Sequence, residues 1–124
     1  MSMRFRLSGT VLDARNPEAL AGFYQALLGW ELASQDPTWV ALRSPEGGAG
    51  LSFQLDPEHE APTWPSRPGV GQMQLHLDIG VDDLAAGVER ALGLGARQAE
   101  VQPQTGVVVL IDPEGHPFCL FTSG

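Results

Sequence analysis

Apolar residues recur at helical spacing in two segments of the chain. In the first segment a stripe follows the i, i+3, i+4, i+7, i+8 pattern of a helix with one buried face. Its members are Leu20, Phe23, Tyr24, Leu27 and Leu28. Asn16 and Pro17 precede the stripe as a capping side chain and a first-turn proline, and Gly29 is a typical stop. The pattern predicts a helix between Asn16 and Gly29.

The second helical segment repeats this texture in the other half of the chain. Asp82 or Asp83 is positioned to cap it, and Gly93 and Gly95 close it. Its apolar stripe consists of Leu84, Val88, Ala91 and Leu92.

Short apolar or alternating runs surround both helical segments and predict strands. Leu51–Leu55 alternates apolar and polar residues, as a half-buried strand does, while Val107–Ile111 is a continuous apolar run typical of a buried strand. The other predicted strands are Phe5–Ala14, Trp30–Ala33, Trp39–Leu42, Met73–Ile79, Ala96–Val101 and Phe118–Phe121. Each half therefore has the order strand, helix, then three strands.

The two halves also share local sequence. Ser44-Pro45-Glu46-Gly47 returns as Asp112-Pro113-Glu114-Gly115, and a Leu-Asp pair lies before each helix, at Leu12-Asp13 and at Leu77-Asp78. This repetition predicts an α+β fold of two βαβββ modules related by internal pseudo-two-fold symmetry. We expect a cupped, mixed, eight-stranded sheet with the helices on its outer face and a pocket between the halves.

The length of 124 residues predicts one domain covering residues 1–124. The first module is expected over about 1–57 and the second over about 71–124. Between them, a segment at about 58–70 is rich in proline and contains Trp64, which indicates an extended and fairly stiff linker.

Charge and composition exclude several classes of partner. The net charge is −8, from 7 basic and 15 acidic side chains, which argues against nucleic acid and against an anionic membrane surface. The sequence has no signal peptide pattern and no apolar run of spanning length. The only cysteine is Cys119, so an intrachain disulfide is impossible and a reducing, cytoplasmic location is predicted.

The sharpest candidate for chemistry is His76. Because side chains alternate along a strand, Gln74, His76 and Asp78 should share one face, which would line the cup. A neutral imidazole is a good ligand for zinc, nickel or iron, and Asp78 can orient it or act as a base. The alternative is an ordinary pocket or surface histidine, and His76 alone does not decide between them.

Other polar and aromatic residues are weaker candidates. Ser52 and Gln54 share a face of the first half's last strand, where they either contact a ligand or face solvent. Cys119 is either a soft metal ligand or a packed core residue. Trp64 is the best aromatic lid for a ligand. For four further residues we expect a structural role only: Tyr24 and Trp30 should lie in the core, and His59 and His116 at the surface.

Three motifs together resemble a known family. Asn16-Pro-Glu-Ala-Leu-Ala-Gly-Phe-Tyr24 with Leu28-Gly29-Trp30 is similar to a segment of glyoxalase-like proteins. His76-Leu-Asp78 with Val81-Asp82-Asp83-Leu84, and the run from Asp112 to Leu120, resemble two others. The resemblance covers essentially the whole chain and is to the vicinal oxygen chelate superfamily, which includes glyoxalases, bleomycin-resistance proteins and extradiol dioxygenases. It implies the same paired βαβββ fold.

The resemblance also implies a metal-ligand set, one residue from the first and last strand of each module. The corresponding positions are Gly9 (Thr10 if the register slips), Gln54 (or Ser52), His76 and Cys119. His76 is the one strong ligand, Gly9 has no side chain, and Cys119 stands where the family usually has glutamate. The set His76, Gln54 and Cys119 would hold zinc, nickel, iron or manganese.

Two functions remain open at this stage, besides a structural or interaction module whose cup is filled by its own side chains. One is an enzyme of the lyase, isomerase or dioxygenase kind, using a divalent metal at His76 with Asp78 beside it. The other is a metal-independent small-molecule binding protein of the drug-sequestering type, in which Gln54, His76 and Asp78 supply polar contacts and Trp64 an apolar lid. Ser52 and Gln74 are further candidate ligand-binding residues. No phosphate loop or dinucleotide fingerprint is present, so no nucleotide cofactor is expected. The resemblance further implies a homodimer.

Overall fold

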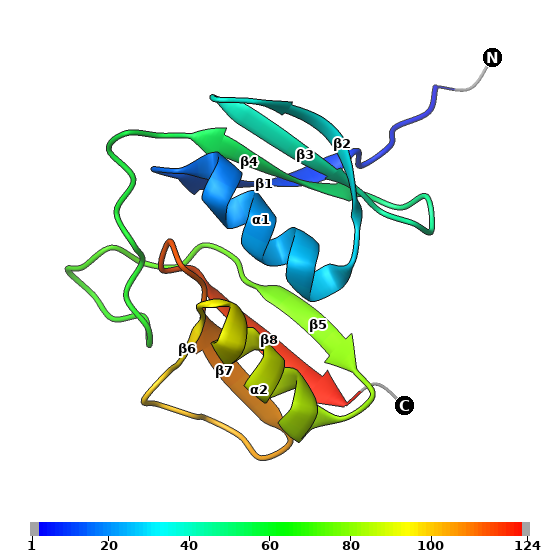
Figure 1. Ribbon diagram of the computed structural model, residues 1–124. Helices are drawn as coiled ribbons and strands as arrows, with labels where there is room; N and C mark the ends of the chain where they lie inside the picture. The colour runs from blue at the N-terminus through cyan, green and yellow to red at the C-terminus, as the bar shows by residue number, and fades with distance from the viewer. Residues whose placement is uncertain (1–2, 123–124) are drawn as a thin grey trace. The chain divides into compact units, whose positions relative to one another are not determined.

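A computed structural model describes residues 3–122, which form two compact units that divide between His59 and Glu60. The first unit contains β1 (Gly9–Ala14), α1 (Pro17–Leu28), β2 (Glu31–Asp36), β3 (Trp39–Arg43) and β4 (Gly50–Leu55). The second contains β5 (Leu77–Val81), α2 (Leu84–Leu94), β6 (Arg97–Gln98), β7 (Val107–Ile111) and β8 (Pro117–Thr122). Figure 1 shows these elements.

The two units share one sheet topology. The strand orders are β1-β4-β3-β2 and β5-β8-β7-β6, and in each sheet the first and last strands of the unit are parallel while the other pairs are antiparallel. The predicted α+β fold of two βαβββ modules is therefore confirmed, with the eight strands divided as two mixed sheets of four.

Both helices begin and end where the sequence predicts. The Asn16 side chain accepts a hydrogen bond from the Ala19 N–H (3.1 Å), and Asp83 accepts one from Ala86 (3.1 Å). Gly29 ends α1 with φ of 73°, a conformation that glycine adopts without a Cβ penalty. Among the residues described, neither helix is long and apolar enough to cross a membrane.

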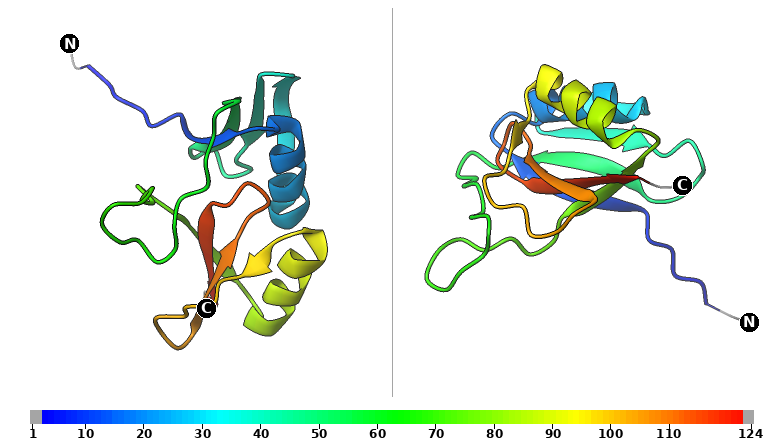
Figure 2. Two further views of the ribbon diagram at one scale, coloured as in Figure 1. Left: turned by 90° about the vertical axis from the view of Figure 1, so that its left-hand side faces the viewer. Right: turned by 90° about the horizontal axis from the view of Figure 1, so that it is seen from below.

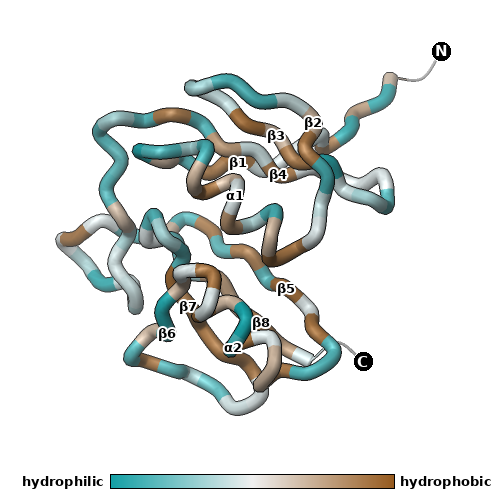
Figure 3. Tube along the Cα trace, in the orientation of Figure 1, coloured by the Kyte–Doolittle hydropathy of each residue, from teal (hydrophilic) through white to brown (hydrophobic). Residues whose placement is uncertain are grey.

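In each unit the helix covers one face of its own sheet (Figure 2), and the core of that unit lies between the helix and the sheet. In the first unit Tyr24 is fully buried and stacks on Phe53 with ring centroids 5.7 Å apart. In the second unit Phe118 and Leu120 are fully buried. Figure 3 shows apolar residues gathered along the strands. Tyr24 is thus a core residue as predicted, whereas Trp30 is only half-buried.

Several strands are shorter than their sequence patterns suggest. Pairing of β1 begins at Gly9, so the predicted start at Phe5 is wrong, and that side chain is 89% exposed. The predicted strand from Met73 begins only at Leu77, because its parallel partner β8 provides pairing from Phe118 onward. Alternation in the sequence extends past the point where a neighbouring strand supplies hydrogen bonds.

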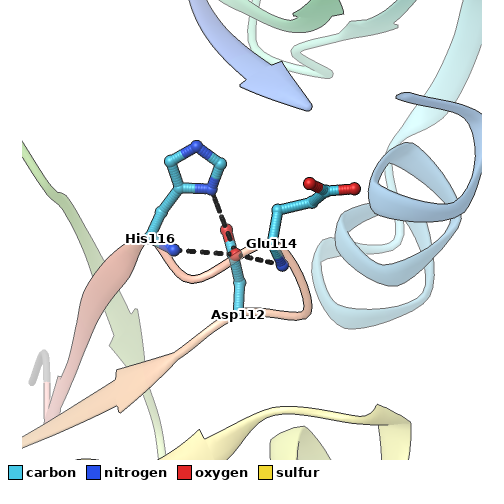
Figure 4. A network of polar contacts seen from close by, with 3 residues as sticks. All are labelled: Asp112, Glu114 and His116. Carbon is cyan, nitrogen blue, oxygen red and sulfur yellow. Dashed lines mark hydrogen bonds and ion pairs between the residues drawn. The ribbon is translucent and has the colours of Figure 1, made fainter. Parts of the chain in front are cut away.

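A buried carboxylate organises the turn between β7 and β8 (Figure 4). The Asp112 side chain is fully buried and accepts hydrogen bonds from the main-chain N–H groups of Glu114 (2.9 Å) and His116 (3.0 Å). The His116 Nδ1 atom lies 2.9 Å from the second Asp112 oxygen. The predicted surface position of His116 is therefore wrong: its side chain is only 16% exposed, because it closes this network.

The proline-rich linker is packed against the second unit. Thr63 bridges to Gln72, which closes a loop, and the Trp64 indole N–H donates to the Val101 carbonyl (3.1 Å). At the β7–β8 turn, Gly115 has φ of 95°, and a Cβ placed there would overlap the Ala61 side chain. Glycine at position 115 therefore permits both the positive φ of the turn and the close approach of Ala61 in the linker.

We expect Gly115→Ala to lower the free energy of unfolding by about 1–3 kcal/mol, because it adds backbone strain at positive φ and a clash with Ala61. Gly106→Ala is a matched control, since Gly106 also has positive φ (85°) but no atom within 4 Å of the added Cβ. Urea denaturation of both variants measures the difference. Equal losses would show that the contact with Ala61 contributes nothing.

Candidate functional site

Three chemically reactive side chains gather on the second sheet. Asp78 on β5 pairs in register with Cys119 on β8, so both side chains leave the same face. His76, just before β5, approaches Asp78 with its Nε2 atom 3.1 Å from Oδ1. One ligand atom from each of the three lies within 4.8 Å of the other two. The predicted neighbourhood of His76 and Asp78 is thus observed, with Cys119 beside them.

The three groups differ in their exposure to water. The side chains of His76 and Asp78 are 38% and 64% exposed, whereas Cys119 is buried. A polar contact between two such exposed side chains contributes only about 0–1 kcal/mol to stability, even when both are charged. The His76–Asp78 contact is therefore not required to hold the fold, and both side chains remain accessible from solvent.

The environment of Cys119 keeps its thiol protonated. Burial raises the pKa of the Cys119 thiol, and the Asp78 carboxylate raises it further through its negative charge and a hydrogen bond. A cation at this position would reverse the effect, because a metal ion stabilises the thiolate. In the metal-free protein Cys119 is thus a weaker nucleophile than an ordinary cysteine.

The geometry fits a single divalent ion. Ligand atoms of one tetrahedral ion lie about 3.3–3.8 Å apart. The distance of 3.1 Å between His76 Nε2 and Asp78 Oδ1 is close to that range, and the ligand atoms of all three residues lie within 4.8 Å of one another. Imidazole nitrogen, carboxylate oxygen and thiolate sulfur are all zinc ligands. Three protein ligands leave a coordination position open for a small molecule.

An apolar wall adjoins the reactive cluster. Cys119 also belongs to a buried group with Ala99, Val109 and Ile111, and Trp64 packs against this group. Trp64 thus lies on the face of the sheet that carries Cys119, rather than on the face covered by α2. The site combines ligand atoms with an apolar surface, as small-molecule sites commonly do.

The other predicted residues lie in different places. Gln54 is exposed on β4 of the first unit, between its register partners Asp13 and Trp39. Ser52 is on the same strand and almost completely buried. Gln74 precedes β5, outside any strand, and is exposed. Within the second unit the structure groups His76 with Cys119, and within the first unit Gln54 lies between Asp13 and Trp39.

Sequence reasoning missed Trp39 and Asp13 as neighbours of Gln54. The sequence did indicate which sheet face they lie on, because Trp39 alternates with the buried residues of β3 and Asp13 with those of β1. What the sequence lacked was the register that aligns three strands. It gave no comparable signal for Asp78 as a third candidate ligand, since the pairing of Asp78 with Cys119 joins positions 41 residues apart.

The chain matches the sequence profile of the glyoxalase-like domain family over residues 9–121. A search of curated proteins found no significant match. Among solved structures, it is similar to a glyoxalase/bleomycin resistance protein/dioxygenase family enzyme from Burkholderia phytofirmans PsJN, with 19% identity, a TM-score of 0.71, and coverage of 95% of this chain and 98% of that one.

Two further structures share the fold. The fosfomycin resistance protein FosX from Mesorhizobium loti has 17% identity and a TM-score of 0.66, with 98% of this chain and 95% of that chain covered. The oxidase ChaP-H2 has 21% identity and a TM-score of 0.63, with 98% and 96% covered. At such identities the likeness extends to the fold alone.

We expect Asp78→Asn to lower the pKa of the Cys119 thiol, because the substitution removes the negative charge that opposes ionisation. Burial, the larger cause, remains, so the pKa should still exceed that of an exposed thiol. The pH dependence of iodoacetamide labelling in the presence of a chelator measures this, since Cys119 is the only thiol. Asp82→Asn is the control, and an equal shift in both variants would contradict the assignment to Asp78.

Proposed function

Since the chain belongs to the glyoxalase-like domain family, within the vicinal oxygen chelate superfamily, we propose that it acts on a small molecule through a divalent metal ion held by His76, Asp78 and Cys119. The observation that carries this proposal is the convergence of three different ligand types within 4.8 Å on one sheet face. This proposal takes Asp78 as the third ligand, from the same unit as His76 and Cys119, whereas the sequence-based set of His76, Gln54 and Cys119 stays a prediction.

The chemistry of the ligands narrows the choice of metal. A thiolate and an imidazole favour zinc, nickel or iron over manganese, which prefers oxygen ligands. The acidic character of the chain, with a net charge of −8, also favours cations near its surface.

When bound, such an ion supplies a Lewis acid that polarises substrate oxygens and stabilises an enolate or alkoxide. The residues of the chain position the small molecule. The buried group around Cys119 and Trp64 excludes water from one side of the site, and the exposed side of His76 and Asp78 admits the substrate. Without an ion, Asp78 orients the imidazole through the 3.1 Å contact. With an ion bound, the second oxygen of Asp78 would accept a substrate proton. These roles suit lyase, isomerase or dioxygenase chemistry.

A specific observation favours the alternative, a metal-independent binding protein. Trp64 and Val107, which pack over the buried group that contains Cys119, offer apolar contact in the same unit as two hydrogen-bonding side chains, His76 and Asp78. This arrangement can hold a small molecule without an ion. In this alternative the raised pKa of Cys119 matters only in keeping a neutral thiol in the apolar wall.

Metal content decides between these functions. We expect untagged protein to carry about one zinc, nickel or iron ion per chain, and His76→Ala, Asp78→Ala and Cys119→Ala each to lose it, because two remaining ligands bind weakly. Elemental analysis measures the ion. In protein reconstituted with cobalt, a sulfur-to-metal charge-transfer band that is lost in Cys119→Ser reports thiolate ligation directly.

His59→Ala is the matched control, because it removes a histidine that lies outside the cluster. It should keep the full metal content and the cobalt band. Protein that is metal-free when purified and resists reconstitution would rule out the metal site. A small molecule that then raises the melting temperature of the chelated protein, but not of His76→Ala, would support the alternative.

A further inference from the structure

A second site candidate lies in the second unit, between the linker and the β6 edge. A cavity of about 430 Å³ opens there, a volume in the range of small-molecule sites. The residues that shape it are Trp64 and Arg67 from the linker, Arg97, Glu100 and Val101 from β6 and the segment after it, and Ile111 from the end of β7. None of His76, Asp78 and Cys119 lines it.

Two arginines, Arg67 and Arg97, line this cavity. Arg97 pairs in register with Ile111, so its side chain leaves the sheet on the face that carries the buried group around Cys119. Arg67 lies in the loop that the Thr63–Gln72 bridge closes, and the Gln72 side chain donates to the Arg67 carbonyl (3.3 Å). The two arginines therefore come from separate segments of the chain. Strand pairing holds the backbone at Arg97, and the Thr63–Gln72 bridge and the bond from Gln72 hold the backbone at Arg67.

Neither guanidinium has an ion-pair or hydrogen-bond partner within residues 3–122. By contrast, Arg43 in the first unit pairs with Glu31. Glu100 is the one acidic residue in the lining, so the charged side chains of the cavity sum to a positive value in a chain whose net charge is −8. This local reversal of sign favours an anion.

The rest of the lining suits an apolar body. The Trp64 ring is fixed on one side by its packing against the buried group and at its edge by the bond to the Val101 carbonyl (3.1 Å). With its N–H already used, the ring offers only its flat apolar surface to a ligand. Val101, which is 47% exposed, contributes aliphatic surface to the cavity.

We infer that this cavity binds an organic carboxylate with a flat, apolar body of one or two rings. The planar guanidinium groups of Arg67 and Arg97 match a carboxylate in shape and charge, and Trp64 stacks on the ring. The inference does not require the metal proposed at His76, because no candidate metal ligand contributes to the cavity.

The test uses 2-naphthoate as the probe and the uncharged, same-shaped 2-naphthamide as its matched comparison. The full chain is titrated calorimetrically at low salt, in the presence of a chelator. Naphthoate should bind at least about tenfold more tightly than the amide, because a hydrogen bond between charged groups adds at least that factor to the binding constant. Added sodium chloride should weaken naphthoate binding and leave the amide unaffected.

Arg67→Gln and Arg97→Gln should each weaken naphthoate binding by about tenfold, while Arg43→Gln should not. Naphthoate should also shift the indole N–H signal of Trp64 in a nitrogen–proton spectrum, assigned with Trp64→Phe, and His76→Ala should bind it as the wild type does. Four results would each overturn the inference. Two are equal affinity for acid and amide and undiminished binding in the double arginine variant. The other two are loss of binding in His76→Ala and no binding at millimolar probe.

Discussion

Parallel pairing of the first and last strand is the constraint on which each unit depends. β1 pairs with β4 and β5 with β8, and a parallel pair requires a crossover, which α1 and α2 provide together with the strands that follow. The register of this pairing decides which side chains meet, and a slip of one residue would turn every side chain to the opposite face. Asp78 meets Cys119 for this reason alone.

The turn before β8 protects that register. Asp112 is a buried carboxylate whose oxygens receive main-chain N–H groups and the His116 ring, so the turn cannot loosen without leaving a buried charge unpaired. Gly115, in the same turn, lets the linker approach and brings Trp64 over the sheet. A network that touches no candidate ligand atom thus positions both the reactive cluster and its apolar wall.

The duplicated frame carries different chemistry in its two copies. The Leu-Asp pair of each first strand meets the last strand in the same way, with Asp13 opposite Gln54 and Asp78 opposite Cys119. Two residues before the aspartate, the second copy has His76, whereas the first has Val11, which cannot bind a metal. The reactive groups are therefore concentrated in the second unit, and the first unit offers an amide, a carboxylate and the Trp39 ring.

The sequence by itself determined the helices and the order of the strands, and it singled out His76 and Asp78 as candidates for chemistry. Helical stripes, caps at Asn16 and Asp83, and strand alternation are local properties, so they survive without knowledge of the neighbours. Only the tertiary structure decided where strands start, that Asp78 joins Cys119, that His116 is enclosed by its own turn, and that Arg67 and Arg97 line one cavity. Each of these depends on register or packing between distant segments, for which a single sequence carries no local physical signal.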